Sequence, residues 1–442
     1  MRDIFSIDAF DFPKDFKWGR ATAGHQIEGD NVNSNWWHKE QIMLSKNPDY
    51  HVSGKACNSY KMYEEDSKIL AELKHGTYRM SIEWSRIEPK EGEFRIEEIE
   101  HYIKVFESLK IRGIRLSLTL VHYAWPQWFE EKGGFSKMEN IDYFLRYVEY
   151  VVPKVCDYVD EWCILNEHNG ALAQSMFDYK INSLRFHAKA YGIIKKYSNK
   201  PVSSAHAFIL PFAKRINDRF DKTLQDYQDI IINEYFFHAV RTGEIVLPFK
   251  DAVYDKEVKN SCDFWAINTY HRRIIDARKA DMYGSPISGA ELKLLPDVNF
   301  RYMNEFYPEN FFSTLTRLAD KPVIITENGI NSYDDDFRIV WILEYLSALA
   351  EVIKSGVDVK GYYHWSLLDN YEWGSYVPKF GLVAVDSKNS FKRTIKKSGY
   401  FYRDIIENNG YKPEMLLKYL TETPKIKRYI EDGKLSTAEI LL

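Results

Sequence analysis

The chain has 442 residues, of which 45% are hydrophobic and 28% are charged, and its formal net charge is -4. This composition supports a large core but gives no basic stripe of the kind that binds nucleic acid, so we expect no nucleic-acid partner. No apolar stretch reaches the length of about 18 residues that a membrane span needs, and residues 1–10 lack a continuous apolar signal segment. We therefore expect a cytoplasmic protein without membrane contact.

Motifs typical of metals and cofactors are absent from the sequence. It contains no HExxH, P-loop or GxGxxG motif, and its 12 histidines are dispersed. Four cysteines lack CxxC spacing and are expected to be reduced thiols in the core: Cys57, Cys156, Cys163 and Cys262. We predict neither a metal nor a cofactor.

Eight segments of the chain are typical of strands that end in turn or polar residues. They begin near residues 16, 77, 114, 161, 202, 262, 322 and 360. Between the third and fourth, apolar residues recur at helical spacing and give one stripe for packing on a sheet: Ile141, Phe144, Leu145, Val148, Val152 and Val155. Similar stripes lie in 59–74, 221–241 and 338–354. The alternation predicts an α/β fold, a single (β/α)8 TIM barrel with long βα loops.

Two glutamates lie where an apolar run turns polar. Glu167 lies in the segment Trp162-Cys-Ile-Leu-Asn-Glu-His-Asn169, and Glu327 lies in Pro322-Val-Ile-Ile-Thr-Glu-Asn-Gly329. Barrel enzymes keep their chemistry at such carboxyl ends of strands. Burying one unpaired polar group costs roughly 2 to 7 kcal/mol, and burying a charge costs more. Two carboxylates at equivalent buried positions therefore call for a functional explanation. Paired work as acid and nucleophile is such an explanation.

The other strand ends are also polar or aromatic. They carry Gln26 and Glu28 (first), Arg79 and Glu83 (second), His122 (third), Asn166 (fourth), Asn268 and Tyr270 (sixth), and Trp365, Glu372 and Trp373 (eighth). Closure of the barrel would gather these side chains at one face. Hydrogen-bonding and aromatic types that converge in this way predict a polyol-binding pocket.

From Phe12 to about Ile406 the chain resembles the retaining β-glycosidases of glycoside hydrolase family 1. The motifs that carry the resemblance are FKWGRATAGHQIEG (16–29), YRMSIEWSRI (78–87), NE (166–167), ITENG (325–329) and WSLLDNYEW (365–373). The resemblance implies a TIM barrel with the acid/base, Glu167, after strand four and the nucleophile, Glu327, after strand seven. In such enzymes the acid protonates the leaving oxygen, and the carboxylate, held about 5 Å away, attacks the anomeric carbon.

Supporting roles also follow from the resemblance. Arg79 is implied to keep Glu327 ionised and oriented, and Tyr270 to donate a hydrogen bond to the same carboxylate. The side chains implied to hold the sugar are Gln26, His122, Asn166, Glu372 and Trp373, with Trp365 as the apolar floor under the ring. Asn268 is added as a substrate-binding candidate because of its place in the sixth strand.

The expected function is a retaining exo-β-glycosidase that acts on β-glucosides, and also on β-galactosides and β-fucosides, as small glycosides or oligosaccharides. One alternative is a 6-phospho-β-glycosidase of the same family, although those members typically lose the acidic residue found here as Glu372. Another is a catalytically silent sugar-binding barrel, which the retention of Glu167 and Glu327 disfavours.

Three positions depart from the pattern of the family, among them Ile164, which stands where a threonine is common. His168 replaces the proline of the usual Asn-Glu-Pro motif, and an ionisable neighbour of the acid would shift the pH optimum in either direction. The Asp that usually follows the third-strand histidine is missing from the segment His122-Tyr-Ala-Trp125, where Trp125 is interpreted as lining the aglycone side.

The end of the chain extends past the resemblance. We expect residues 1–408 to form one catalytic barrel and residues 409–442 to form a C-terminal extension. Apolar residues predict a short amphipathic helix in this extension: Leu416, Leu417, Tyr419 and Leu420. Packing on its own barrel and contact with a partner subunit, which implies a homo-oligomer, are both open at this point.

Overall fold

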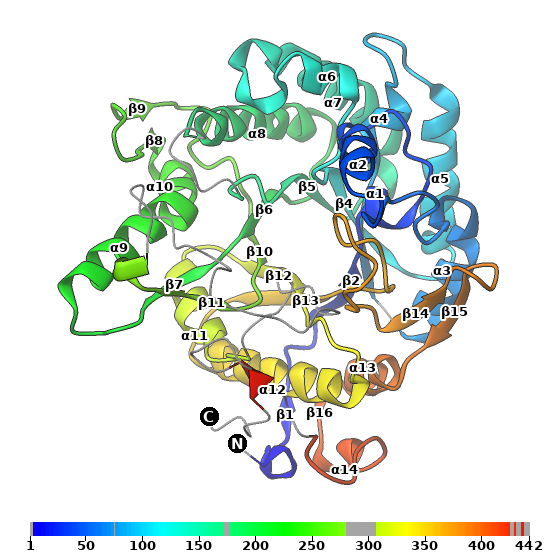
Figure 1. Ribbon diagram of the computed structural model, residues 1–442, viewed down its shortest axis with the longest axis vertical. Helices are drawn as coiled ribbons and strands as arrows, with labels where there is room; N and C mark the ends of the chain where they lie inside the picture. Colours follow the sequence, from blue (N-terminus) through cyan, green and yellow to red (C-terminus); the bar gives the residue numbers. More distant parts are fainter. Residues whose placement is uncertain are drawn as a thin grey trace.

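The computed structural model describes residues 3–74, 76–170, 177–279, 306–424, 428–429 and 435–436. Eight parallel strands form a closed barrel in the order β10-β12-β13-β2-β3-β4-β5-β6 (Figure 1). Their bounds are β2 Lys17–Ala21, β3 Thr77–Ser81, β4 Arg115–Val121, β5 Glu161–Asn166, β6 Val202–Ala207, β10 Trp265–Asn268, β12 Val323–Asn328 and β13 Val359–Trp365. The predicted TIM barrel is confirmed, and all eight predicted strands begin within a few residues of the observed ones.

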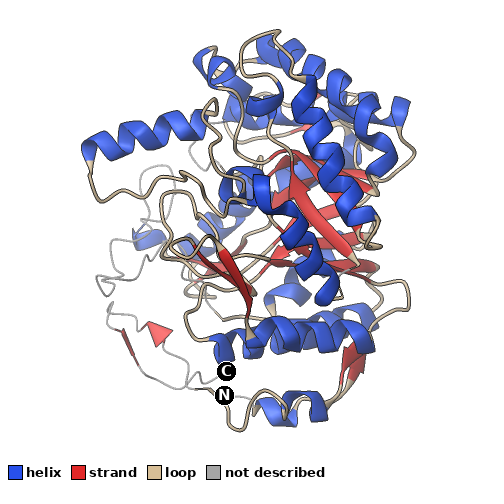
Figure 2. Cartoon of the chain, turned by 90° about the vertical axis from the view of Figure 1, so that its right-hand side faces the viewer, coloured by secondary structure: helices blue, strands red, loops and turns tan. Residues whose placement is uncertain are grey.

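Helices surround the barrel and cover its strands (Figures 1 and 2). The longer ones are α2 Asn35–Lys46, α3 Ser59–Glu72, α5 Ile96–Lys110, α7 Ile141–Val155, α8 Phe177–Tyr197, α9 Arg219–Asp229, α10 Tyr235–Thr242, α12 Asp335–Lys354 and α13 Lys397–Asn408. The shorter ones are α1 Gly24–Ile27, α4 Trp84–Ile87, α6 Gln127–Glu131, α11 Asn310–Leu315 and α14 Pro413–Leu416. The four predicted amphipathic stretches all lie in helices of this layer.

Short strand pairs lie outside the barrel. They are β1 Phe10–Asp11 with β16 Gly410–Tyr411, β7 Leu210–Ala213 with β11 Arg272–Ile275, β8 Glu244–Ile245 with β9 Val253–Tyr254, β14 Val383–Asp386 with β15 Lys392–Ile395, and β17 Arg428–Tyr429 with β18 Leu435–Ser436. The pair β1–β16 ties the two ends of the described chain together. Asn409 reinforces this contact, because it accepts from Trp18 Nε1 at 2.9 Å and donates to the Phe12 carbonyl at 2.8 Å.

Helix α7 shows how the apolar pattern places these elements. One face buries Phe144, Tyr147, Val148, Val151, Val152 and Val155 against the barrel. The charged residues of the helix lie on the other face, so the 3.6-residue period of the sequence fixes which side contacts the strands. Inside the barrel, Lys17 binds Glu161 at 2.9 Å and Tyr363 donates to the same carboxylate at 2.7 Å. A buried carboxylate in the barrel interior is thus paired.

The first part of the C-terminal extension packs on its own barrel. Leu416 and Leu420 are buried in the larger core cluster, and Tyr419 donates to Asp404 at 2.9 Å. The predicted helix is shorter than expected, since α14 ends at Leu416 and leaves Leu417 65% exposed. The remainder of the predicted extension, apart from β17 and β18, lies outside the described residues.

We predict that the extension stabilises the fold through Leu416. Leu416→Ala removes a fully buried side chain and should lower the free energy of unfolding by about 2 to 5 kcal/mol. Leu417→Ala is the matched control, and at this exposed site the change should stay within about 0.5 kcal/mol. Denaturant unfolding of both variants measures the difference, and equal losses would contradict the packing described here. Truncation after Asn409 should likewise lower the melting temperature.

Candidate active site

The two glutamates that stand out in the sequence lie at the carboxyl ends of barrel strands. Glu327 is the penultimate residue of β12 and is buried, and Glu167 follows directly after β5. Burial raises the pKa of Glu327, and the charge of Glu167 adds to this shift. The structure therefore brings together two groups that are 160 positions apart in the sequence.

Glu327 is held by a cation and a phenol. Arg79 Nη1, from β3, binds Oε1 at 2.5 Å, and the Tyr270 hydroxyl donates to Oε2 at 2.7 Å. The Arg79 side chain is fully buried, and its Nη2 donates to Asn166 Oδ1 at 2.6 Å. Both oxygens of Glu327 are thus fixed by donors from different strand ends, which orients this carboxylate in the barrel mouth.

Among the described residues, the side-chain donors to Glu167 are neutral. Asn268 Nδ2 donates to Oε1 at 3.0 Å, and the hydroxyl of Tyr123 donates to Oε2. Asn268 also donates to Asn166 at 3.0 Å and accepts from Thr326 at 2.7 Å. A continuous chain of hydrogen bonds therefore links the two carboxylates through Arg79 and the amides of Asn166 and Asn268.

A second polar group surrounds Glu372. Gln26 Nε2 donates to Glu372 Oε2 at 3.3 Å and to the Tyr371 carbonyl at 2.8 Å. Trp365, the last residue of β13, donates from its indole to Glu372 Oε1 at 3.2 Å. Three of the predicted sugar-binding residues are thus in direct contact with one another, and all three are buried.

Aromatic rings join this group to the carboxylates. The His122 ring stacks on Trp365 with centroids 5.9 Å apart and on Trp373 with centroids 6.2 Å apart. Burial and the charge of Arg79 hold the pKa of His122 well below its ordinary value, so the ring is neutral. Its Nε2 lies 3.0 Å from Asn166 Nδ2 and accepts this hydrogen bond. The structure places every predicted site residue in this connected set.

Burial dominates the ionisation of the two acids that face Arg79 and Gln26. It raises the pKa of Glu327 to about 7, with Arg79 opposing the shift and the charge of Glu167 adding to it. It raises the pKa of Glu372 to about 8, against the hydrogen bonds from Trp365 and Gln26. Both carboxyl groups therefore exchange protons near neutral pH rather than near pH 4.5.

Tyr123 is a site residue that the sequence reasoning did not single out. Its only signal is its place directly after His122 at the end of β4. Three residues of the site have a left-handed backbone, Tyr123 at φ 61°, Glu167 at φ 45° and Trp373 at φ 45°. Such conformations are uncommon for bulky residues and cluster at functional sites.

His168 does not act as a charged neighbour of Glu167. Burial, together with the nearby His206 and Lys180, holds the pKa of His168 well below its ordinary value. The ring packs on Phe236 at 4.6 Å, and its Nδ1 lies 3.3 Å from the Tyr235 hydroxyl. The imidazole is therefore neutral near pH 7 and sits among α10 side chains.

Trp125, interpreted as lining the aglycone side, lies near the same strand end. Its indole donates to Glu130 at 2.7 Å and its ring packs edge-on against Phe135 at 5.2 Å.

Within the described residues no three His, Cys, Asp or Glu side chains are grouped so as to hold a metal ion. Among the helices of the described chain, none has both the length and the apolarity to cross a membrane.

Comparisons with known proteins agree with this geometry. The family model "Glycosyl hydrolase family 1" matches residues 9–232 and 217–411. Beta-glucosidase A of Acetivibrio thermocellus is 29% identical over 90% of this chain and 99% of its own length. The 6-phospho-beta-glucosidase GmuD of Bacillus subtilis is 26% identical over 91% of this chain and 99% of its own. The solved beta-glycosidase from Pyrococcus horikoshii superposes with a TM-score of 0.81 at 30% identity, over 93% of this chain and 98% of that one.

The fold, the site and the similarity to these proteins identify the chain as an O-glycosyl hydrolase. The chain belongs to glycosyl hydrolase family 1. The predicted family, the predicted fold and the prediction of an enzyme of the retaining β-glycosidase type are confirmed at this level.

The raised pKa of Glu372 predicts a pH-dependent stability. The folded chain keeps this proton up to about pH 8, whereas the unfolded chain loses it near pH 4.5. Because the folded state binds more protons in this window, the free energy of unfolding should fall as the pH rises through it. Glu372→Gln cannot ionise, so its decline between these pH values should be shallower.

Urea unfolding at a series of pH values measures this slope. The same substitution at the exposed residue Glu414 controls for the loss of a carboxylate and should leave the slope unchanged. A Glu372→Gln variant whose stability declines as steeply as the wild type would show that the burial of this group does not shift its ionisation.

Proposed function

We propose that this glycosyl hydrolase is an exo-β-glycosidase that cleaves unphosphorylated β-glucosides by double displacement. Glu327 is the nucleophile and Glu167 is the acid/base. The observation that carries the proposal is the difference between their partners within the described part of the chain: Glu327 contacts the cation Arg79, whereas the side-chain donors to Glu167 are the neutral Asn268 and Tyr123. A nucleophile must bear a negative charge when it attacks, and an acid/base must gain and lose a proton.

The two steps follow from these partners. In the first, the Glu327 carboxylate bonds to the anomeric carbon, and Glu167 gives its proton to the glycosidic oxygen as the aglycone leaves. In the second, Glu167 takes a proton from water, the oxygen of that water bonds to the anomeric carbon, and the ester to Glu327 breaks. Arg79 stabilises the Glu327 charge at the start and end, and its bond to Asn166 persists while that charge is absent.

The sugar is proposed to lie between the carboxylates and the Glu372 group. Glu372, Gln26 and His122 supply hydrogen-bonding atoms for hydroxyl groups, and the Trp365 indole supplies an apolar surface under the ring. The Gln26 Oε1 atom is buried without a hydrogen-bond partner among the described residues. A substrate hydroxyl would satisfy it. The names of relatives, among them a beta-glucosidase and a beta-galactosidase, support glucosides and galactosides as substrates.

A phosphorylated sugar is the second candidate, because a relative of similar identity is named a 6-phospho-beta-glucosidase. The residue that argues against it here is Glu372. Its partners include the amides of Gln26 and Asn370 and the indole of Trp365, which are neutral donors. A phosphate dianion is held by cationic side chains, whereas Glu372 with its amide and indole partners suits an uncharged hydroxyl group.

The proposal extends to the rest of the chain. Residues 1–408 act as one catalytic unit on a small glycoside or oligosaccharide, and residues 409–442 are an extension without a part in the chemistry. A cytoplasmic location is supported by the free and buried thiols Cys57, Cys163 and Cys262. A homo-oligomer and the absence of a nucleic-acid partner remain predictions.

The nucleophile is tested by covalent trapping. Glu327→Gln should remove nearly all turnover but leave sugar binding measurable, because the amide keeps the shape of the side chain and cannot form the ester. A 2-fluoro glucoside should add one sugar mass to the wild-type peptide that contains Glu327, as read by mass spectrometry. Glu327→Gln should take up no label, and a labelled peptide elsewhere in the chain would overturn the assignment.

The substrate class is tested at Glu372. Removing one partner of a buried hydrogen bond costs roughly 1 to 3 kcal/mol, so Glu372→Ala should lower kcat/KM for a β-glucoside by about ten- to a hundredfold. The loss on a β-fucoside should be smaller, because this sugar lacks the 6-hydroxyl group.

Specificity constants for the glucoside, the fucoside and the 6-phosphoglucoside measure this difference in wild type and variant. The wild type should prefer the unphosphorylated sugars. A preference for the 6-phosphoglucoside would establish the second candidate function, and identical losses on glucoside and fucoside would remove Glu372 from contact with the 6-hydroxyl.

A further inference from the structure

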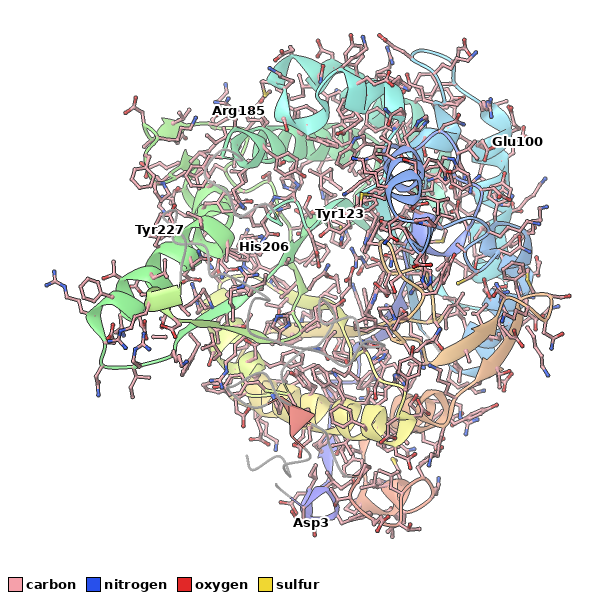
Figure 3. The ribbon with its side chains drawn as sticks, viewed as in Figure 1. Asp3, Glu100, Tyr123, Arg185, His206 and Tyr227 are labelled. Atoms are coloured by element: carbon pink, nitrogen blue, oxygen red, sulfur yellow. The ribbon has the colours of Figure 1, made fainter. Side chains whose placement is uncertain are left out.

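Tyr123 makes a contact with the acid/base that the function described so far does not use. Its hydroxyl donates to Glu167 Oε2, while Asn268 Nδ2 donates to Oε1 at 3.0 Å. The residue follows β4, and Figure 3 shows it near the middle of the view, inside the ring of helices. Each oxygen of the Glu167 carboxylate therefore has one neutral donor, and Tyr123 supplies one of the two.

The surroundings fix this tyrosine in place. Its ring stands edge-on to Trp373 at 5.3 Å and 88°, and edge-on to His122 at 5.5 Å and 82°. Its backbone has φ 61°, a conformation that large side chains rarely adopt. The turn after β4 thus directs the side chain across the strand end toward β5 rather than back into the core.

We propose that Tyr123 is a positioning residue for Glu167, whose hydroxyl orients the carboxylate and favours its ionised, base form. This inference rests on the proposed role of Glu167 as acid/base. A hydrogen bond donated to a carboxylate stabilises the charged state relative to the protonated state. Tyr123 therefore assists the second step, in which Glu167 accepts a proton from water. Before the first step the same hydrogen bond disfavours the protonated form of Glu167.

The hydroxyl keeps its own proton throughout. Burial and the charge of Glu167 raise the pKa of Tyr123 well above its ordinary value. The proton that moves in each step passes between Glu167 and the leaving group or water, and Tyr123 remains a donor.

Other titratable groups face Glu167 and Tyr123 from the surrounding elements. They are Glu327 on β12, Arg79 on β3, Tyr270 after β10, His122 after β4, His168 after β5 and Tyr179 on α8. Removing the hydroxyl of Tyr123 leaves all of these charges in place. The shift in the ionisation of Glu167 then reports the one hydrogen bond that is lost.

The pH dependence of kcat/KM for Tyr123→Phe tests the proposal. The proposed first step needs the protonated form of Glu167, so loss of this form at high pH produces the basic limb of the profile. Loss of a donor to the carboxylate disfavours its charged form, and the basic limb should move upward by about one pH unit, the size expected for a hydrogen bond to a charged group. A basic limb that stays at its wild-type position would overturn the proposal.

Two other Tyr→Phe variants are matched controls. The Tyr270 hydroxyl donates to Glu327, so Tyr270→Phe should move the acidic limb upward instead, because Glu327 must be ionised. Tyr147 is buried and donates to the Leu120 carbonyl of β4 at 3.0 Å. Tyr147→Phe removes a buried hydroxyl at the same strand and should move neither limb of the pH profile. If it does shift a limb, the shift seen for Tyr123→Phe arises from a general structural change and not from the lost hydrogen bond to Glu167.

The step-specific effect gives a second readout. With a dinitrophenyl glucoside, whose leaving group needs little protonation, the second step limits turnover and kcat of Tyr123→Phe should fall several-fold. With an alkyl glucoside, the first step limits, and turnover should fall less. Equal losses on both substrates would contradict the role in the base form.

Glu167→Ala separates failure of this inference from failure of the proposed function. Its glycosylation step should slow severely for alkyl glycosides and much less for nitrophenyl ones. Equal losses would remove Glu167 from the acid/base role, and the inference about Tyr123 would be overturned with it. A Glu167→Ala variant that shows the expected difference, beside a Tyr123→Phe variant with an unmoved basic limb, would overturn the role of Tyr123 alone.

Discussion

Arg79 holds a positive charge inside the barrel, where its side chain has no exposure to solvent. A buried guanidinium is costly unless it is paired and hydrogen-bonded, and Arg79 meets this condition through Glu327 on one side and Asn166 on the other. Because these partners come from β12 and β5, the charge ties together two strand ends on different sides of the barrel. The orientation of both glutamates depends on this arrangement: Glu327 is bound directly, and Glu167 is reached through Asn268.

The neutrality of the remaining donors has its own consequence. His122 lies close to Arg79, and an uncharged ring avoids repulsion between two buried cations. The amides of Gln26, Asn166 and Asn268 add directional hydrogen bonds without adding charge. Among the described side chains that contact the two glutamates, Arg79 is the cation, and its field acts on Glu327 more than on the other carboxylates.

The sequence was sufficient to predict the barrel because buried parallel strands form short apolar runs whose ends are marked by polar residues. Glu167 and Glu327 were predicted for the same reason, since each is the first acidic residue after such a run. Tyr123 was not predicted, because the contact depends on a left-handed turn after β4 that no residue type announces. Leu417 was placed in a helix by its spacing, but α14 ends one residue earlier and leaves it exposed. The local sequence pattern thus predicts where the strands end. Which side chains come into contact depends on how the barrel closes in three dimensions.

The pairing of β2 with β13 bears on how this chain folds as it is synthesised. β2 is the first barrel strand in chain order, but its partner on one side, β13, is made only after the other barrel strands. Until then one edge of the growing sheet is open, and Trp18 and Phe12 lack the partner Asn409. The loop that closes at this point spans most of the chain, so closure comes late and its entropic cost falls on the last contacts to form. We expect incomplete chains to expose this sheet edge. They should depend on chaperones until β13 pairs with β2 and Asn409 binds Trp18 and Phe12.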